Sequence, residues 1–218
     1  MRMAAGGKNN MECVLFDWDG TLLDSFRADA QAYLHMFHAL GIYWSIAELK
    51  RHYSPDWYRV YQAARLPRAK WDDADRLWMQ FYRRHQPDLQ PGARRVLYAL
   101  RRRFTLALVS SGSRARVRRQ LLEHDVAGLF RAKVCSEDAT RRKPHPAPLR
   151  MALDRLRMAP EVCVYVGDAP EDIEMAHRAG VRAIGVLGGS PVPKRLRAAS
   201  PDALIETIRE LPNLLREF

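Results

Sequence analysis

The chain has 218 residues, of which 47% are hydrophobic and 28% are charged, and its formal net charge is +11. A chain of this length and composition can bury a core without disulfide bonds, so a disordered tail protein and a collagen-like chain are excluded. Its apolar runs are short and interrupted by charge, and none approaches the ~18 residues of a membrane-spanning helix.

The first ten residues are small and polar and lack the apolar stretch of a signal peptide. We expect residues 1–10 to be a disordered leader and the fold to begin near Met11. The three cysteines, Cys13, Cys135 and Cys163, form no CxxC pair. We therefore expect them to be reduced core residues of a cytoplasmic protein.

Short apolar runs alternate with stretches of helical period along most of the chain. A continuous apolar run such as residues 13–16 is typical of a buried parallel strand. Strands that alternate with helices indicate an α/β fold, with a parallel, Rossmann-like sheet covered by helices on both faces. The expected strands are 13–16, 105–109, 132–135, 162–166 and 183–187, and the expected helices are 92–102, 114–124, 148–157 and 172–179.

One long segment interrupts this alternation. Residues 26–86 contain no convincing strand, their apolar residues recur with a helical period, and they hold four of the five tryptophans. A proline-rich stretch at 86–92 marks the end of the segment. We therefore predict a helical cap over 26–89, inserted into an α/β core formed by 11–25 and 90–218.

Carboxylates follow two of the expected strands. Asp17 and Asp19 come after the first strand, and Asp168 and Asp172 come after the strand at 162–166. In open α/β sheets, ligands bind at the carboxyl ends of the strands. If the two strands are neighbours, up to four carboxylates converge, and their repulsion requires a cation. An all-oxygen ligand set favours Mg²⁺.

Two further residues complete a candidate phosphoryl-transfer site. Ser110 follows a strand and offers a hydroxyl, and Lys143 offers a fixed positive charge. Carboxylates, Mg²⁺, lysine and serine around one cleft suit a reaction in which catalysis is mostly positioning and charge neutralisation. The structural alternatives are a helix N-cap for Ser110 and a solvated basic run for Lys143. For His145 and His177 we expect solvent or packing roles.

The order of these motifs resembles that of the haloacid dehalogenase-like hydrolases. The four signatures are the Asp-Trp-Asp-Gly-Thr run that begins at Asp17, Ser110 after the second strand, Lys143-Pro144 before a helix, and Gly167-Asp168 with Asp172. The resemblance covers the chain from Met11 onward. It is strongest to the phosphoglycolate phosphatase-like branch, which has a helical cap after the first motif.

The resemblance implies a role for each of these residues. Asp17 would be the nucleophile that forms an aspartyl-phosphate, and Asp19 would protonate the leaving oxygen and then activate water. Ser110 would bind the transferring phosphoryl group, and Lys143 would bridge that group and the nucleophile. Mg²⁺ would be held by Asp17, the backbone carbonyl of Asp19, and Asp168.

The remaining roles concern support and substrate. Asp172 would support the metal site or orient the lysine. Backbone N–H groups near Trp18, Ser111 and Gly112 are expected to cradle phosphate oxygens. The segment 53–59 lies between two helical stretches, and we expect it to lie over the site with Arg59 reaching a substrate anion. The alternative is an ordinary helix–helix connection with Trp57 packed in the core of the cap. Two departures from the family's pattern are Ala169, where a small hydroxyl residue is usual, and the bulky Trp18 between the two acids.

The resemblance therefore favours a Mg²⁺-dependent phosphatase that acts on a small phosphorylated metabolite, as a monomer or homodimer without a membrane partner. The alternatives on the same fold are a phosphomutase, a pyrophosphatase and a phosphonate hydrolase. The last needs a cap lysine, and only Lys50 and Lys70 are available. A basic nucleic-acid binding module is the non-enzymatic alternative, but the arginines fall at helical spacing, which favours solvated helix faces over nucleic-acid partners.

Overall fold

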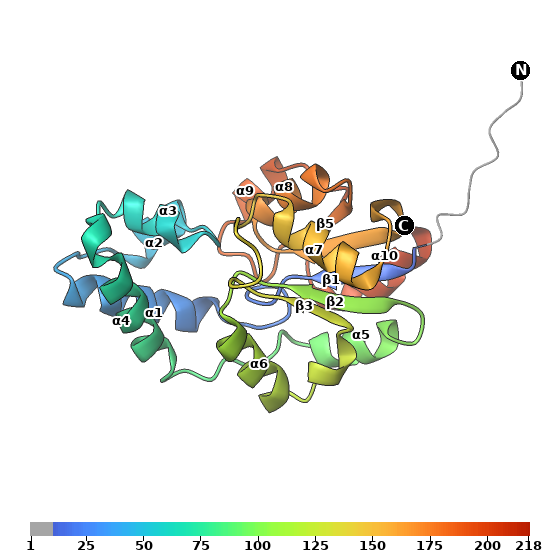
Figure 1. The fold of residues 1–218 in the computed structure, drawn as a ribbon, viewed down its shortest axis with the longest axis horizontal. Coiled ribbons are helices and arrows are strands. Elements are labelled where there is room, and N and C mark those ends of the chain that lie inside the picture. The colour runs from blue at the N-terminus through green and yellow to red at the C-terminus, as the bar shows by residue number, and fades with distance from the viewer. Residues whose placement is uncertain (1–10) are drawn as a thin grey trace, which may run out of the picture.

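The protein, described here from a computed structural model that covers residues 11–218, contains a six-stranded parallel sheet (Figure 1). The predicted disordered leader at 1–10 lies outside the described residues. The strands lie in the order β3-β2-β1-β4-β5-β6. This arrangement confirms the predicted α/β fold with a parallel sheet. The strands are β1 (Cys13–Phe16), β2 (Thr105–Val109), β3 (Ala132–Val134), β4 (Cys163–Gly167), β5 (Arg182–Val186) and β6 (Ala203–Ile205).

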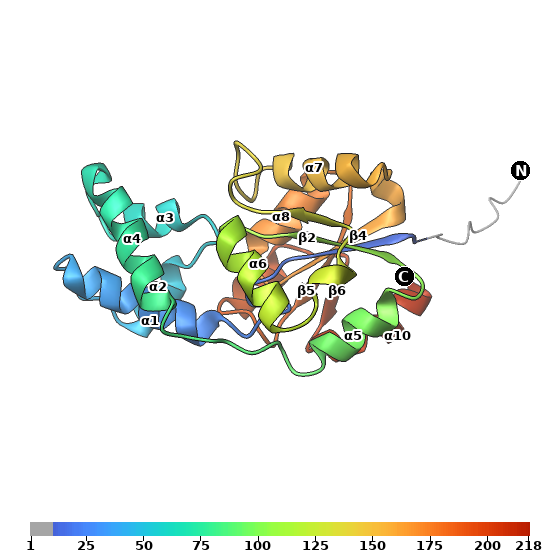
Figure 2. The same cartoon turned by 60° about the horizontal axis from the view of Figure 1, so that its bottom comes forward.

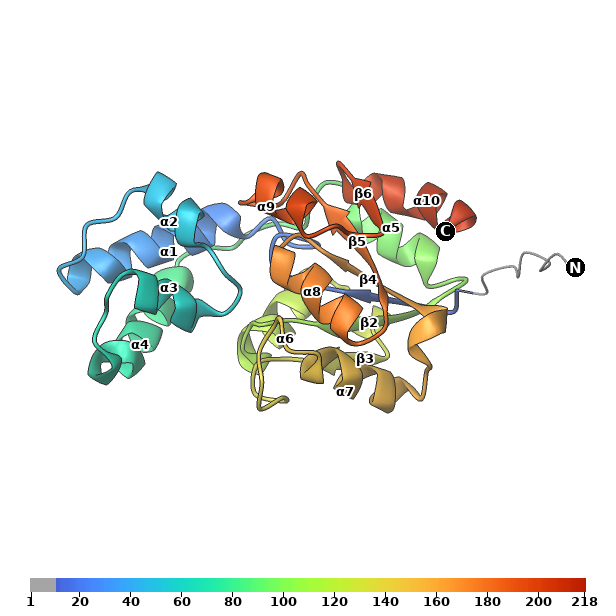
Figure 3. The same ribbon diagram turned by 90° about the horizontal axis from the view of Figure 1, so that it is seen from above.

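Helices cover both faces of the sheet, and β1 shows why its sequence is apolar throughout. Val14 and Phe16 pack on one side, in a core shared with α5 (Ala93–Leu100), α6 (Arg114–Glu123) and α10 (Leu211–Glu217). Cys13 and Leu15 point to the other side. A strand buried on both faces needs an unbroken apolar run. The second face is covered by α7 (Ala147–Leu156), α8 (Pro170–Arg178) and α9 (Pro193–Ala198) (Figure 3).

Between β1 and α5 the chain forms a separate group of helices, on the left in Figure 1. They are α1 (Phe26–Ala39), α2 (Ile46–His52), α3 (Trp57–Ala63) and α4 (Trp71–Tyr82). Their own core is rich in aromatic residues such as Tyr33, Phe37 and Tyr61. The described residues contain no strand between 26 and 82, as the sequence predicts. That 26–89 acts as a separate cap domain on an 11–25 and 90–218 core stays a prediction.

The two chain segments that lead into and out of these helices lie side by side. Asp24 donates a backbone hydrogen bond to Asp88, and Gln90 donates one to Leu22. Leu23 also forms an isolated antiparallel bridge with Leu89. The helical segment therefore joins the sheet through a hydrogen-bonded pair of connections.

The sequence analysis missed the C-terminal elements. β6 has three residues, of which only Ile205 is buried, so no apolar run marks it. The expectation for the cysteines is confirmed, since Cys13, Cys135 and Cys163 are buried and free. Of the helices that the structure describes, none is long and apolar enough to cross a membrane.

Candidate active site

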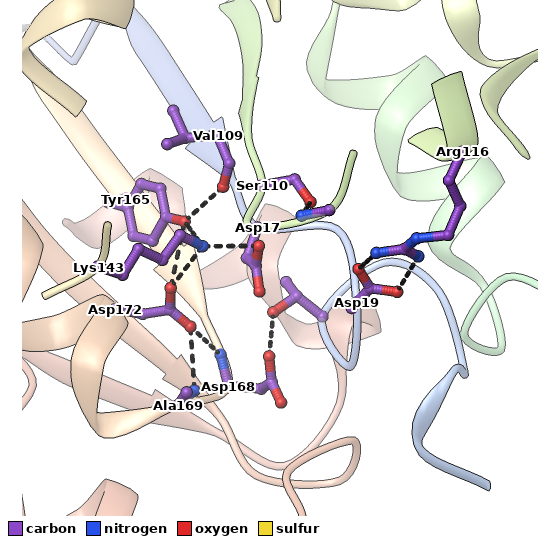
Figure 4. A network of polar contacts seen from close by, with 12 residues as sticks. Asp17, Asp19, Val109, Ser110, Arg116, Lys143, Tyr165, Asp168, Ala169 and Asp172 are labelled. Carbon is purple, nitrogen blue, oxygen red and sulfur yellow. Dashed lines mark hydrogen bonds and ion pairs between the residues drawn. The ribbon is translucent and has the colours of Figure 1, made fainter. Parts of the chain in front are cut away.

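The candidate site lies where three neighbouring strands end. Asp17 follows β1, Ser110 follows β2 and Asp168 follows β4, and β1 pairs with both other strands. Parallel pairing brings these carboxyl ends to one edge of the sheet, and Figure 4 shows the side chains gathered there. The structure thus unites residues that are up to 151 positions apart in sequence, from Asp17 to Asp168.

Lys143 is the centre of a buried polar network (Figure 4). Its Nζ donates hydrogen bonds to Asp17 Oδ1 at 2.7 Å, to Asp172 Oδ1 at 2.8 Å and to the Tyr165 hydroxyl at 2.8 Å. Burial alone would lower the pKa of Lys143, but Asp17 and Asp172 together raise it above its usual value. The lysine is therefore a fixed cation, and a solvated basic run does not describe it.

Tyr165 is a member of this network that the sequence analysis missed. Its hydroxyl donates to the backbone oxygen of Val109 at 3.0 Å, which ties β4 to the end of β2. Its neighbours in β4 are apolar, and as a strand the run predicts no polar role for the tyrosine. A buried tyrosine needs a polar partner for its hydroxyl, and this requirement is the feature of the sequence that points to a polar network at Tyr165.

Asp172 accepts hydrogen bonds through both of its carboxylate oxygens. While its Oδ1 accepts from Lys143, its Oδ2 accepts the backbone N–H groups of Asp168 at 3.2 Å and Ala169 at 3.1 Å. A Cβ at Gly167 would lie 2.5 Å from the Cβ and Cγ of Asp172, so this close approach requires glycine. Asp172 thereby orients the lysine and the loop that carries Asp168.

Three carboxylates are arranged to hold a cation. Asp17, Asp168 and Asp172 each offer an oxygen, and these atoms all lie within 4.8 Å of one another. Thr21 donates to Asp168 Oδ1 at 2.9 Å. Among the described residues, no hydrogen-bond donor meets the second oxygen of either Asp17 or Asp168. These two free oxygens and the all-oxygen donor set fit a Mg²⁺ ion.

Burial opposes the ionisation of two of these acids. Burial raises the pKa of Asp17 to about 7, against the lowering effect of Lys143. Burial, together with the charge of Asp17, raises the pKa of Asp168 well above its usual value. A bound cation would favour the ionised form of both groups.

Asp19 lies apart from this cluster and pairs with Arg116 instead. The guanidinium donates to Asp19 Oδ1 at 2.8 Å and to Oδ2 at 2.7 Å, a bidentate arrangement (Figure 4). Burial would raise the pKa of Asp19, but Arg116 outweighs this effect and holds the pKa below its usual value. Asp19 is therefore ionised in this arrangement.

Arg116 also links the sheet region to the helical segment. Its guanidinium lies over the rings of Trp78 and Tyr82, 5.8 and 5.1 Å from their centroids. Figure 2 shows α6, which carries Arg116, on the side of the sheet that faces α4. A Cβ at Gly112 would lie 2.2 Å from the Arg116 guanidinium, so glycine leaves room for it. We had interpreted the arginines of 114–119 as solvated, and nothing in their spacing distinguishes Arg116.

The loop after β2 contains Ser110, Ser111 and Gly112. Ser110 is buried, and its Oγ accepts the Gly112 N–H at 3.0 Å. The N-cap residue of α6 is Ser113, so the N-cap alternative for Ser110 does not hold. Ser111 and Gly112 line the cavity at the site, whereas the Trp18 side chain is buried and donates to Gln120. Phosphate binding by this loop and by the Trp18 N–H stays a prediction.

Three other candidates lie away from the cavity. The Arg59 side chain is 56% exposed and pairs with Asp56 at 3.7 Å, and it does not line the cavity. His145 accepts a local backbone N–H, and His177 pairs with Asp202 at 2.9 Å. The structure therefore does not bring Arg59 to the reacting groups, because α3 turns its side chain toward solvent.

A cavity of about 290 Å³ lies between the sheet edge and the helices. Asp17, Asp19 and Asp168 lie at its sheet end. We call the lining residues of the helical segment the helical wall. These residues are Asp29, Tyr33, Tyr53, Ser54, Pro55, Trp57, Tyr61, Asp75, Trp78, Met79 and Tyr82.

Similar proteins were found by sequence. The family model for haloacid dehalogenase-like hydrolases matches residues 14–186. The pyrophosphatase PpaX of Oceanobacillus iheyensis is 28% identical over 209 residues, which cover 93% of this chain and 95% of that protein. The phosphoglycolate phosphatase of Salmonella paratyphi A is 31% identical over 108 residues, or 50% of this chain and 43% of that enzyme.

Solved structures share the fold. A hydrolase from Pseudomonas syringae superposes with a TM-score of 0.83 at 24% identity, over 95% of this chain and 99% of that one. CbbY from Rhodobacter sphaeroides, solved in complex with phosphate, superposes with a TM-score of 0.77 at 23% identity, over 92% and 96%. Together with the family match over most of the chain, these likenesses show that the protein belongs to the haloacid dehalogenase-like hydrolases, among the phosphatases of that family.

Proposed function

We propose that the chain is a Mg²⁺-dependent phosphatase that hydrolyses a small phosphate monoester through an aspartyl-phosphate on Asp17. The observation that carries this proposal is the position of the Asp17 carboxylate. One of its oxygens accepts from the buried Lys143, the other meets no donor among the described residues, and Asp17 lines the cavity. A carboxylate held by one oxygen leaves the other available for attack on phosphorus.

The neighbouring groups have separate tasks in this reaction. Lys143 neutralises charge that develops on the phosphoryl oxygens, and it stays in place because Asp172 and Tyr165 hold it. Asp17 and Asp168 would hold Mg²⁺, with Asp172 beside them, and the ion would neutralise further negative charge of the phosphoryl group. Ser110 and the N–H groups that follow it would bind the phosphoryl oxygens.

Asp19 would handle the protons. As an ionised carboxylate beside Arg116, it is prepared to accept a proton from the water that hydrolyses the aspartyl-phosphate. To protonate the leaving oxygen, it must first turn away from Arg116 and gain a proton. In the arrangement described, the ion pair with Arg116 therefore suits Asp19 to the hydrolysis of the aspartyl-phosphate and not to the protonation of the leaving oxygen.

The residues that line the cavity can be compared with the needs of two alternative activities. A phosphonate hydrolase needs a lysine that faces the substrate, but neither Lys50 nor Lys70 lines the cavity. A pyrophosphatase is favoured by the similarity to PpaX. The second phosphate of a pyrophosphate substrate would need a further cation. Arg116 is the only basic side chain among the described lining residues, and it is already paired with Asp19.

The test is to trap the intermediate and remove the metal. An acid quench of the enzyme with a generic aryl phosphate, followed by intact mass and peptide mapping, should find phosphate on Asp17. Excess EDTA should abolish turnover, and added Mg²⁺ should restore it. Phosphate on Asp19, or undiminished hydrolysis in EDTA, would overturn the proposal.

A further inference from the structure

The helical wall of the cavity is aromatic and acidic, and it contains no lysine, arginine or histidine among the described lining residues. Its rings pack closely against one another. Trp78 stacks on Tyr82 with centroids 4.7 Å apart, and Tyr33 lies 6.2 Å from Trp78. Tyr33 and Tyr82 are 4% and 1% exposed, so they lie behind the wall's surface, whereas Tyr53, Trp57 and Trp78 are partly exposed. Arg142 already lies over Trp57 and Arg116 over Trp78, which is the contact that π-faces make with cations.

Two carboxylates stand in this wall without an ion pair. Asp75 accepts the Tyr61 hydroxyl at 2.8 Å, and Asp29 accepts the Trp78 indole N–H at 3.1 Å. Neither acid forms a salt bridge with any residue that the structure describes. Arg116, the one cation in the lining, is already paired through both nitrogens to Asp19.

Arg142, in the loop between β3 and α7, is a basic residue that contacts this wall through Trp57. Its guanidinium lies over Trp57 and Tyr58, 4.1 and 4.3 Å from their centroids, and it does not line the cavity. It lowers the pKa of Asp75, yet burial still leaves that pKa raised. Burial also raises the pKa of Asp29 to about 7. Arg116 acts on Asp29 in the same lowering sense, so each acid has a guanidinium in its vicinity, but neither acid forms an ion pair among the described residues.

We propose that the helical wall recognises a positively charged leaving group, so that the substrates are phosphate monoesters of quaternary or protonated amino alcohols. This inference rests on the proposed phosphatase function. The phosphoryl group would lie against Asp17 and Lys143 at the sheet end. The cationic nitrogen would lie against the helical wall, within the field of Asp29 and Asp75.

The same features disfavour other leaving groups. A carboxylate or a second phosphate would meet two acids and the negative faces of the rings, and among the described lining residues the one cation, Arg116, is already paired with Asp19. A neutral leaving group of equal shape would keep the apolar contact but lose the attraction of a cation to the rings and acids. Charge on the leaving group is therefore the property that this cavity selects.

The experiment compares esters that differ in charge and little in shape. Phosphocholine is compared with 3,3-dimethylbutyl phosphate, in which a neutral carbon replaces the nitrogen, and with the anionic 2-phosphoglycolate. With Mg²⁺ present, kcat/KM for phosphocholine should exceed that for the neutral ester by about tenfold or more, because only the charged nitrogen is attracted by the carboxylates and rings of the wall. The anionic ester should be the poorest substrate.

Variants assign the preference to the wall. Asp75→Asn and Asp29→Asn keep side-chain size and should each reduce the ratio of phosphocholine to neutral-ester kcat/KM severalfold. Asp72→Asn is the matched control, since Asp72 is an exposed acid on the same helix as Asp75 and does not line the cavity. It should leave the ratio as it is in the parent.

The possible results are distinguishable. Hydrolysis of an aryl phosphate with equal or better turnover of the neutral or anionic ester would overturn the cation proposal and leave the phosphatase proposal standing. Failure with every ester, including the aryl phosphate, would overturn the proposed function itself. A cation preference that survives in both wall variants would also overturn the assignment to Asp29 and Asp75.

Discussion

The sheet end and the helical wall of the cavity are charged in different ways. At the sheet end Lys143 contacts Asp17 and Asp172, and Arg116 contacts Asp19, so of the acids there only Asp168 has no ion pair among the described residues. In the helical wall, Asp29 and Asp75 accept hydrogen bonds from neutral donors only. Groups that are paired and buried are held in fixed positions, as a reaction centre requires. Acids without ion pairs are available to a ligand. The comparison therefore assigns the chemistry to the sheet and the selection of substrate to the helices.

Removal of the nucleophile should give the largest effect. Asp17→Asn retains the size of the side chain but cannot form the aspartyl-phosphate, so we expect a loss in kcat on the order of 10⁶-fold, as for other removed nucleophiles. Steady-state hydrolysis of an aryl phosphate measures it, with unfolding curves to show that the fold persists. Turnover equal to that of the parent would show that Asp17 is not the nucleophile.

Substitution of Asp19 should cost less, because it moves protons and does not bond to phosphorus. General acid–base catalysis is typically worth ~10²–10⁴-fold, and we expect a loss of that size in Asp19→Asn. The loss should be smaller for an ester with a good leaving group, which needs little protonation. Kinetics with two esters of different leaving-group pKa test this, and equal losses for both would contradict the acid role.

Lys143→Met tests how much the ion pairs of the sheet end contribute to the free energy of unfolding. The substitution leaves Asp17 and Asp172 buried without their cation, which typically costs ~3–5 kcal/mol in the free energy of unfolding. Urea unfolding in EDTA measures it, and Mg²⁺ should recover part of the loss if the ion binds the same carboxylates. Lys194→Met, an exposed lysine on α9, is the matched control and should change stability by less than ~0.5 kcal/mol. An equal effect of both variants would contradict the buried network.

The sequence predicted the sheet end better than the helical wall for a physical reason. Asp17 and Asp168 directly follow apolar strands, and parallel pairing places the ends of such strands together. The positions of Asp29 and Asp75 depend on how four helices pack, which no periodic pattern specifies. Arg116 was missed for the same reason, because its partners Asp19 and Tyr82 come from other elements.

The smallest effect is expected at Arg59, where sequence and structure suggest different roles. The position of the segment 53–59 in the sequence predicts that Arg59 reaches a substrate anion, whereas in the structure its side chain is 56% exposed and pairs with Asp56 at 3.7 Å. A surface pair of this kind contributes ~0–1 kcal/mol. We therefore expect Arg59→Gln to change kcat/KM by less than about twofold and the free energy of unfolding by less than ~0.5 kcal/mol.

Arg116→Gln is the informative comparison. It removes a buried arginine from the cavity and leaves Asp19 without its cation, which should lower the free energy of unfolding by several kcal/mol. Kinetics with phosphocholine and the neutral ester, together with urea unfolding, measure both variants. A tenfold rise in KM for Arg59→Gln would show that α3 approaches the site when substrate binds, and would return the selection of substrate to an anion-binding residue.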